Sequence, residues 1–308
     1  MRKPERLPEG LASAGFTVAD ARAAGVPRKR LYAADLQSPF FGMRTSGVDL
    51  ADHIQLCRAA ATVLPPGTFF SHRSAAVLHG LPVPLRALPL HPEVSVFDPS
   101  RPPEIVGVDA HQLTWSGQQI ATVEGLPVIG AADTWAQLSR LLPVGDLVVL
   151  GDFLVTGSEP YTGHPPPTDR ERLEAAVRRH GRRRGVQSLR LALERVRYGS
   201  LSPQESRLRL ALVDAGLPEP ELNYRIEEDG TTIAMIDLAY PLHKVAVEYL
   251  GDHHRTDRET YRNDIHRREL LVDRAWSVIL VTAADDLHHA ALRTRRALLQ
   301  STPGETPI

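Results

Sequence analysis

Two apolar runs separated by a short turn decide the fold of the C-terminal part of the chain: Ile233-Ala-Met-Ile-Asp-Leu-Ala-Tyr240 and Val245-Ala-Val-Glu-Tyr249. Each run has the length and composition of a buried strand, and the four residues between them are enough for a hairpin connection. If the residues that flank the turn pair with each other, the numbers of every cross-strand pair sum to 485. Asp237 then stands opposite Glu248 on one face of the sheet. A one-residue shift of register would separate them.

These two carboxylates need compensation for their charge. A charged group in an apolar strand is costly unless something compensates it, and two facing carboxylates repel unless a proton or a cation lies between them. Mg²⁺ prefers oxygen ligands and waters, and it leaves positions for a phosphate. Asp237 and Glu248 therefore predict a Mg²⁺ site, with Mn²⁺ as a substitute. The alternative is that one of the two acids faces solvent on a half-exposed strand.

The segments around the hairpin show alternating helix and strand patterns. Ser202-Pro-Gln-Glu205 opens a helix, which Gly216 and Pro218 end. The other expected elements are strands near 222–227, 231–240 and 245–250, a charged helix over 257–274, a buried strand over 276–282 and a last helix over 285–300. This order, α-β-β-β-α-β-α, predicts an α/β domain with a mixed sheet.

Three more side chains are candidates for the same site. Glu205 fits a capping box, in which its side chain only reaches back to the Ser202 amide, and it fits equally well as a further acid of the site. His253 and His254 follow Glu248 in a loop, and taken by themselves they are surface histidines. A zinc site would need a third protein ligand at matching spacing, and the sequence offers no convincing one.

The composition excludes several classes of protein. A length of 308 residues corresponds to about two domains. The 36 Lys and Arg residues nearly balance the 37 Asp and Glu residues, which excludes a uniformly basic surface. The single cysteine, Cys57, excludes an internal disulfide framework and a cysteine-based zinc site. With no apolar signal region and no run of about 18 apolar residues, we expect a soluble, cytoplasmic protein with no membrane partner.

Local imbalances in composition divide the chain. Eight arginines stand against one acid between Arg178 and Arg197, and the preceding stretch 156–168 is too rich in proline and glycine for a helix or strand interior. We expect four regions: a helix-turn-helix-like region at 1–47, a middle region at 48–155, a linker with an arginine-rich helical segment at 156–199, and the α/β domain at 200–300.

Two basic clusters are candidates for DNA binding. A helix over 17–24, a turn at Gly25 and a second helix over 28–36 form a helix-turn-helix pattern. The second helix begins with Arg28, Lys29 and Arg30. In the arginine-rich segment, the candidates for tracking DNA phosphates are Arg182, Arg183 and Arg184. The alternatives are an ordinary helical hairpin with a solvated basic end and a solvated basic helix.

The joint spacing of the C-terminal residues resembles that of a known family. The matching residues are Glu205, Asp237, Val245-Ala-Val-Glu-Tyr-Leu-Gly-Asp-His-His254, Asp264-Ile-His-Arg267-x-x-x-Leu271 and Trp276-x-Val-Ile. Together they resemble the very-short-patch-repair-like endonuclease domain of the PD-(D/E)xK, restriction-endonuclease-like superfamily, over about residues 200–300. The resemblance implies an αβββαβ restriction-endonuclease-like core, a mixed sheet flanked by helices, and Mg²⁺-dependent hydrolysis of a DNA phosphodiester.

The same resemblance implies roles for the site residues. Asp237 and Glu248 hold the metal ion, His254 acts as general base or donates to the phosphate, and Glu205 assists. Arg267 neutralises phosphate charge with Asp264 orienting it, and the alternative for this pair is a surface ion pair. The family motif usually reads Glu-x-Asp-Gly or Glu-x-Lys, whereas its third position is Leu250 in this sequence, so the site lacks one polar group.

The first half of the chain is similar to abortive-infection type IV antitoxin-like proteins. Those proteins carry a Ser-His-Arg-Ser-Ala-Ala-x-x-His-Gly-Leu stretch, which runs from Ser71 to Leu81 here. These residues are typical of a helix start and of packing, with Ser71 as the N-cap. The resemblance implies an N-terminal winged helix-turn-helix and DNA binding or regulation, in defence against foreign DNA.

The residues favour a Mg²⁺-dependent DNA endonuclease joined to a winged-helix, antitoxin-like DNA-binding region. A second hypothesis is a non-catalytic DNA-binding regulator whose nuclease-like domain has decayed, and Leu250 favours it. A third, a metal-dependent hydrolase of another phosphoester, accounts for the carboxylates but not for the arginine run or the helix-turn-helix pattern.

Overall fold

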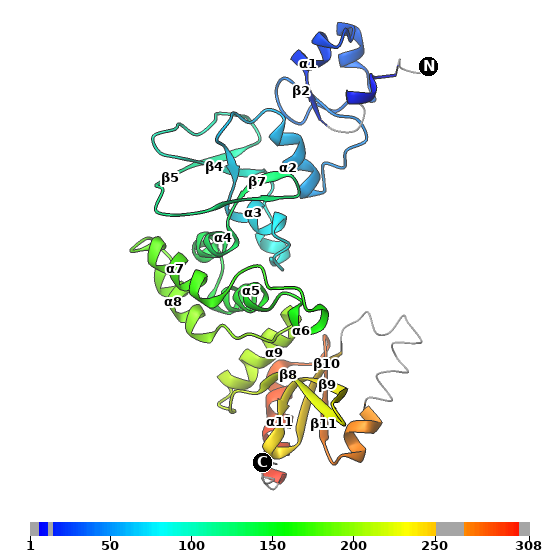
Figure 1. The fold of residues 1–308 in the computed structure, drawn as a ribbon, viewed down its shortest axis with the longest axis vertical. Coiled ribbons are helices and arrows are strands. Elements are labelled where there is room, and N and C mark those ends of the chain that lie inside the picture. Colours follow the sequence, from blue (N-terminus) through cyan, green and yellow to red (C-terminus); the bar gives the residue numbers. More distant parts are fainter. Residues whose placement is uncertain (1–5, 12–14, 251–267, 302–308) are drawn as a thin grey trace. The chain divides into compact units, whose positions relative to one another are not determined.

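The computed structural model describes residues 6–11, 15–250 and 268–301 and has a mixed α/β fold (Figure 1). The chain divides into two compact units, and each unit combines segments that are distant in the sequence. Unit 1 consists of residues 1–147 and 170–191, and unit 2 consists of residues 148–169 and 192–308. In the part of the chain that is described, no helix is both long and apolar enough to cross a membrane.

The N-terminal part of unit 1 contains short elements. These are the 3-10 helix η1 (Glu9–Leu11), β1 (Phe16–Thr17), α1 (Val18–Ala23), the 3-10 helix η2 (Arg28–Tyr32) and β2 (Met43–Arg44), with β1 antiparallel to β2. The Thr17 side chain accepts a hydrogen bond from the Asp20 amide at 3.0 Å and so caps α1. The second helix was expected to run to Leu36, but it ends at Tyr32 because Ala33 has an extended backbone, with ψ of 147°.

The rest of unit 1 is built around a five-stranded sheet of order β5-β4-β3-β7-β6. Its strands are β3 (Phe69–Phe70), β4 (Glu93–Phe97), β5 (Asp109–Leu113), β6 (Ile120–Val123) and β7 (Leu126–Ile129). The helices of this part are α2 (His53–Ala61), α3 (His72–Leu78), η3 (Leu85–Ala87), α4 (Ala131–Gln137), η4 (Leu138–Arg140) and α7 (Arg170–His180). Phe69, Phe70, Val94 and Val128 are buried with residues of α2 and α3 in one core, and α7 packs against α4.

Unit 2 is built on a four-stranded sheet of order β11-β10-β9-β8. Its elements are α6 (Glu159–Thr162), α9 (Pro203–Asp214), β8 (Glu221–Glu228), β9 (Thr231–Tyr240), η5 (Pro241–His243), β10 (Val245–Leu250), a helical segment at 268–273, β11 (Ser277–Thr282) and α11 (Leu287–Gln300). Strands β10 and β11 are parallel and the other neighbours are antiparallel. The sheet is therefore mixed, and the described elements follow the expected order.

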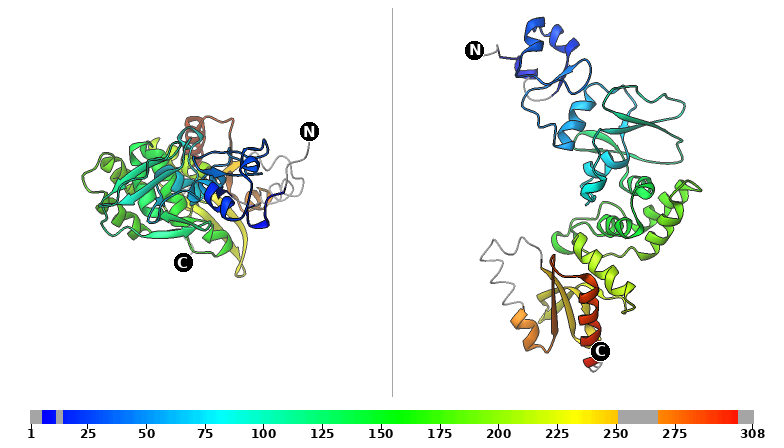
Figure 2. Two further views of the ribbon diagram at one scale, coloured as in Figure 1. Left: turned by 90° about the horizontal axis from the view of Figure 1, so that it is seen from above. Right: turned by 180° about the vertical axis from the view of Figure 1, so that it is seen from behind.

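The two faces of this sheet have separate cores. Val245 and Val247 pack with residues of α9 and α11, and Figure 2 shows α11 lying along the strands. Ala246, which alternates with them on β10, packs with Leu271 and Trp276. Both faces of the central strands are thus covered, which is why the runs that begin at Ile233 and Val245 are apolar except at Asp237 and Glu248.

Two helices carry the chain across the boundary between the units, α5 (Val144–Thr156) and α8 (Val186–Arg195). The stretch 156–168, expected to be a linker or long exposed loop, is mostly exposed and includes α6. It is held within unit 2 by hydrogen bonds. The Tyr198 hydroxyl donates to Glu159 at 2.7 Å, and the Gly199 amide donates to the Thr156 hydroxyl at 2.9 Å.

Candidate functional site

The β9–β10 hairpin has the register that the turn length predicts. Val245 pairs with Tyr240, Ala246 with Ala239, and Val247 with Leu238, so each pair sums to 485. The pairing ends there, and Asp237 and Glu248 are the residues that follow the last pair on the two strands. The Tyr249 amide donates to Asp237 Oδ2 at 2.8 Å. The Asp237 carboxylate therefore lies against the backbone of β10, directly beside Glu248.

The two acids differ in exposure. Glu248 is 2% exposed and lies on β10, which has β9 on one side and β11 on the other. Asp237 is half-buried. The interpretation that one of these acids simply faces solvent does not fit Glu248. A buried carboxylate is stable only with compensating interactions, so this position is costly for a residue that serves packing alone.

On its other side, Asp237 stands opposite Asn223 of β8, because Leu222 pairs with Leu238 and Tyr224 with Ile236. Asn223 is buried and has a left-handed backbone, with φ of 46°, a conformation that asparagine tolerates better than most residues. Strand β9 is irregular at Asp237. Ile236 and Leu238 are two residues apart and would point to the same face of a regular strand, but they belong to the cores on opposite faces of the sheet. Irregularities of this kind often re-aim a side chain near a site.

Glu205 connects the start of α9 to this point of the sheet. Its Oε2 accepts hydrogen bonds from the Leu201 amide at 2.9 Å and from the Asn223 side chain at 3.0 Å, and Ser202 Oγ caps the Glu205 amide at 3.1 Å. The carboxylate reaches the Leu201 amide, one residue before the Ser202 amide that a capping box would use. Through Asn223, Glu205 is a neighbour of the Asp237 position and is suited to positioning it.

The donor set can be compared with what Mg²⁺ requires. Among residues 6–11, 15–250 and 268–301, no group of three or more His, Cys, Asp or Glu side chains is arranged to hold a metal ion. Mg²⁺ is commonly held by one or two carboxylates, with waters and substrate phosphates in the other positions, and Asp237 and Glu248 supply that number of carboxylates on two neighbouring strands. His253, His254, Asp264 and Arg267 lie outside the described residues.

Leu250, which occupies the third position of the motif, is the last residue of β10. It is half-buried and pairs with Thr282 of β11. Lys244, at the other end of β10, donates to the Arg274 carbonyl at 3.2 Å. The lysine nearest to the two acids along the described chain thus lies in the turn before β10, at the end opposite to Leu250.

The N-terminal basic cluster is only partly available for DNA. Arg28 and Lys29 are exposed. Arg30, in contrast, donates to both carboxylate oxygens of Asp35 at 2.9 and 2.8 Å, and its side chain is 8% exposed. The sequence pattern did not reveal this ion pair, because the acid lies beyond the end of η2.

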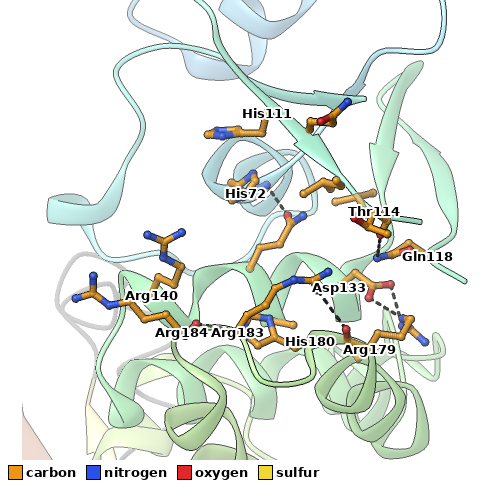
Figure 3. A pocket seen from close by; sticks show the side chains of 16 residues that line it. His72, His111, Thr114, Gln118, Asp133, Arg140, Arg179, His180, Arg183 and Arg184 are labelled. Carbon is orange, nitrogen blue, oxygen red and sulfur yellow. Dashed lines mark hydrogen bonds and ion pairs between the residues drawn. The ribbon is translucent and has the colours of Figure 1, made fainter. Parts of the chain in front are cut away.

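Arg182, Arg183 and Arg184 lie in the turn between α7 and α8 and are exposed. Arg183 and Arg184 line a cavity in unit 1, and Arg182 is not among its lining residues (Figure 3). The turn closes tightly at Gly185, which has φ of 96°; a Cβ there would lie 2.5 Å from Ser139 Oγ.

Ser71 occupies the N-cap position of α3, but its side chain does not cap the helix. Its Oγ accepts from Ser95 Oγ at 2.7 Å and contacts His72 Nδ1 at 2.9 Å. Arg73 forms hydrogen bonds to Glu93 through its amide and its guanidinium at 2.6–2.8 Å. The stretch from Ser71 to Leu81 therefore builds a polar network between α3 and β4, which the expectation of simple packing missed.

A second buried network in unit 2 joins α5 to α9. Arg209 is 1% exposed and Asp152 is fully buried; Arg209 Nη2 donates to Asp152 Oδ2 at 2.9 Å. Burial raises the pKa of Asp152, and the charge of Arg209 opposes that shift. Both residues interrupt apolar helical runs, which is the signal that singled out Asp237 and Glu248. The pairing itself is structural and involves no site residue.

No family model matches the chain. The uncharacterized proteins MT2308 and Rv2248 of Mycobacterium tuberculosis (strains CDC 1551 and H37Rv) are each 32% identical to it over 117 residues. That match covers 38% of this chain and 43% of each relative, so the chain spans less than half of their length. The crystal structure of the RV2827C protein from Mycobacterium tuberculosis is similar over 61% of this chain and 78% of that one, with 21% identity and a TM-score of 0.41.

Proposed function

We propose that unit 2 is a divalent-cation-dependent endonuclease that hydrolyses a phosphodiester of DNA at Asp237 and Glu248. The observation that carries this proposal is the hydrogen bond from the Tyr249 amide to Asp237 Oδ2, which holds this acid against β10 next to Glu248 in the chain. The order of elements from α9 to α11 and the mixed sheet support a restriction-endonuclease-like core.

In this proposal, Asp237 and Glu248 would hold Mg²⁺, which when bound polarises the scissile phosphate and lowers the pKa of a water ligand. The chain itself supplies orientation. The Tyr249 amide holds one oxygen of Asp237, and Glu205 fixes Asn223 on the neighbouring strand. Glu205 is thus a positioning residue. His254 as general base and Arg267 as phosphate contact stay predictions.

DNA binding by unit 1 is the second part of the proposal. Arg28 and Lys29 are the exposed basic residues of the helix-turn-helix-like segment, and exposed cations near DNA release counterions and add affinity without sequence preference. We propose that this segment, as a winged helix, holds DNA for the cleavage site. Leu250 favours the competing function, a DNA-binding regulator without cleavage.

A nicking assay on supercoiled plasmid DNA tests the proposal. With Mg²⁺ or Mn²⁺ the full chain should convert supercoiled DNA to the open circle, and EDTA should stop the reaction. Asp237→Asn and Glu248→Gln should each reduce the rate by more than about 100-fold, since even outer-shell partners of metal ligands are worth 10–100-fold. Glu227→Gln, which removes an exposed acid of β8, is the matched control and should retain the wild-type rate.

The competing function predicts a different outcome. A folded wild-type chain that binds duplex DNA in a salt-sensitive way, yet does not nick it with either cation, would overturn the nuclease proposal and favour the regulator. Nicking that persists in Asp237→Asn at the wild-type rate would show that another site, or a contaminant, is responsible.

A further inference from the structure

Unit 1 contains a cavity of ≈ 480 Å³ between α3 and β5 on one side and α4, η4 and α7 with its following turn on the other (Figure 3). Its volume is in the range of sites for small molecules, which is roughly 300–1,000 Å³. A DNA duplex is too wide to enter such a space. The cavity is therefore suited to a small ligand or to the end of a single strand.

The charge of the cavity is positive. Arg140, Arg183 and Arg184 line it together with Arg179. Asp133 is the acid among the described lining residues, and Arg179 already holds both of its oxygens at 2.9 Å. That pair is neutral, so three guanidinium groups from η4 and the α7–α8 turn leave an excess of positive charge. An anionic group is the ligand that this excess favours.

The opposite wall carries two imidazole rings, His72 and His111, whose centroids lie 4.3 Å apart. Ser71 Oγ accepts a hydrogen bond from Ser95 Oγ at 2.7 Å and lies 2.9 Å from His72 Nδ1, which holds the His72 ring in place. Burial lowers the pKa of His72 to about 3, so this ring stays neutral at pH 7. The wall offers flat ring surfaces, and His72 adds no charge to it.

The arginine turn is held in place by its own contacts. His180 Nε2 donates to the Arg184 carbonyl at 3.1 Å, and Arg183 Nη1 donates to the Arg179 carbonyl at 3.2 Å. The His72 amide in turn donates to Gln137 Oε1 at 2.8 Å, which ties the two walls at α3 and α4. The cavity is thus built from fixed backbone, and a ligand needs to order only exposed arginine side chains.

We infer that this cavity binds a phosphorylated ligand of nucleotide size, with its phosphate at Arg140, Arg183 and Arg184. Planar guanidinium groups match phosphate oxygens in pairs, and the stacked rings of His72 and His111 suit a flat base. Two sources share this chemistry: a free nucleoside monophosphate and the 5′-phosphate end of a DNA strand. The site is separate from the carboxylates of unit 2 and does not depend on cleavage.

Calorimetric titration of the full chain tests the inference. The probes are inorganic pyrophosphate, 5′-AMP, 5′-GMP, 5′-CMP and 5′-UMP, with adenosine as the uncharged control. Pyrophosphate and at least one monophosphate should bind, and adenosine should not. Arg140→Gln and Arg184→Gln should each weaken binding by about 10-fold or more, because hydrogen bonds to charged groups are worth that much. Arg182→Gln, an equally exposed neighbour, should have no effect.

Competition separates the two sources. Displacement of the bound monophosphate by a 5′-phosphorylated single strand, but not by the same strand without its phosphate, identifies strand ends as the ligand. If the phosphorylated strand fails to compete, the free nucleotide is the ligand. The inference is overturned if none of the charged probes binds at millimolar concentration, or if Arg140→Gln and Arg184→Gln bind as tightly as Arg182→Gln. None of these outcomes depends on nicking activity.

Discussion

At the scale of single residues, the chain keeps several ionisable groups buried in one protonation state. His72 is the clearest case, since burial lowers its pKa to about 3, with further contributions from the charges of His111, Arg73 and Arg140. Burial also raises the pKa of Cys57 to about 12, which makes it a poor nucleophile. Because their pKa values differ between the folded and unfolded states, such groups make the free energy of unfolding depend on pH.

We expect stability to fall as the pH is lowered through the range from about 6.5 to about 3. In this range an unfolded His72 binds a proton and the folded one does not, so the unfolded state gains by up to about 1.4 kcal/mol per pH unit. His72→Asn removes the titration and tolerates the φ of 51°. Urea unfolding of the full chain at several pH values measures the effect. As the pH is lowered, the free energy of unfolding should fall less steeply for His72→Asn than for the wild type. Equal slopes would contradict this prediction.

The pairing of β9 with β10 was predictable from sequence because it is local, and the opposition of Asp237 and Glu248 beyond its last pair stays a prediction. The connection has four residues, and that length fixes which residues pair. The contacts of Glu205 with Asn223 and of Arg30 with Asp35 were not predictable, because side-chain partners across turns leave no periodic signal. His254 and Arg267 lie outside the described residues, so their roles stay predictions.

At the scale of elements, helices and strands that come from long hydrophobic runs were predicted well, and elements of only a few residues were not. The runs of unit 2 appear as β9, β10 and β11 within a few residues of the expected bounds. The sheet of unit 1 was not predicted as a whole. Its central strand β3 has two residues, and its order β5-β4-β3-β7-β6 depends on pairings between distant segments, which periodicity does not encode.

The contact between α5 and α9 depends on the buried pair of Arg209 and Asp152. Arg209→Ala leaves a buried carboxylate without its charge partner, so we expect a loss of about 3–5 kcal/mol in the free energy of unfolding. Arg207→Ala, on the same helix but only half-buried, should cost less than about 1 kcal/mol. Chemical denaturation of both variants measures the difference. A similar cost for the two would show that Arg209 contributes only through packing.

At the scale of the whole molecule, the chain has a net charge of −1 but concentrates its basic and acidic groups in different places. The composition predicted a boundary near 156–168 or slightly later, near Gly199, and the compact units divide between 147 and 148, 169 and 170, and 191 and 192. Residues 170–191 belong to unit 1 because α7 packs on α4. The chain thus comes back to unit 1 after residues 148–169 of unit 2. This depends on how the helices pack, and amino-acid composition does not reveal it.

We propose that Asp237 and Glu248 together bind a divalent cation, and calorimetric titration of Mn²⁺ into the full chain measures this binding. The wild type and Glu227→Gln should bind Mn²⁺ with equal affinity, and Asp237→Asn should lose at least about 10-fold, because one of two carboxylate ligands has become a neutral amide. Circular dichroism must show all three chains folded. Equal Mn²⁺ affinity in the wild type and Asp237→Asn would contradict the claim.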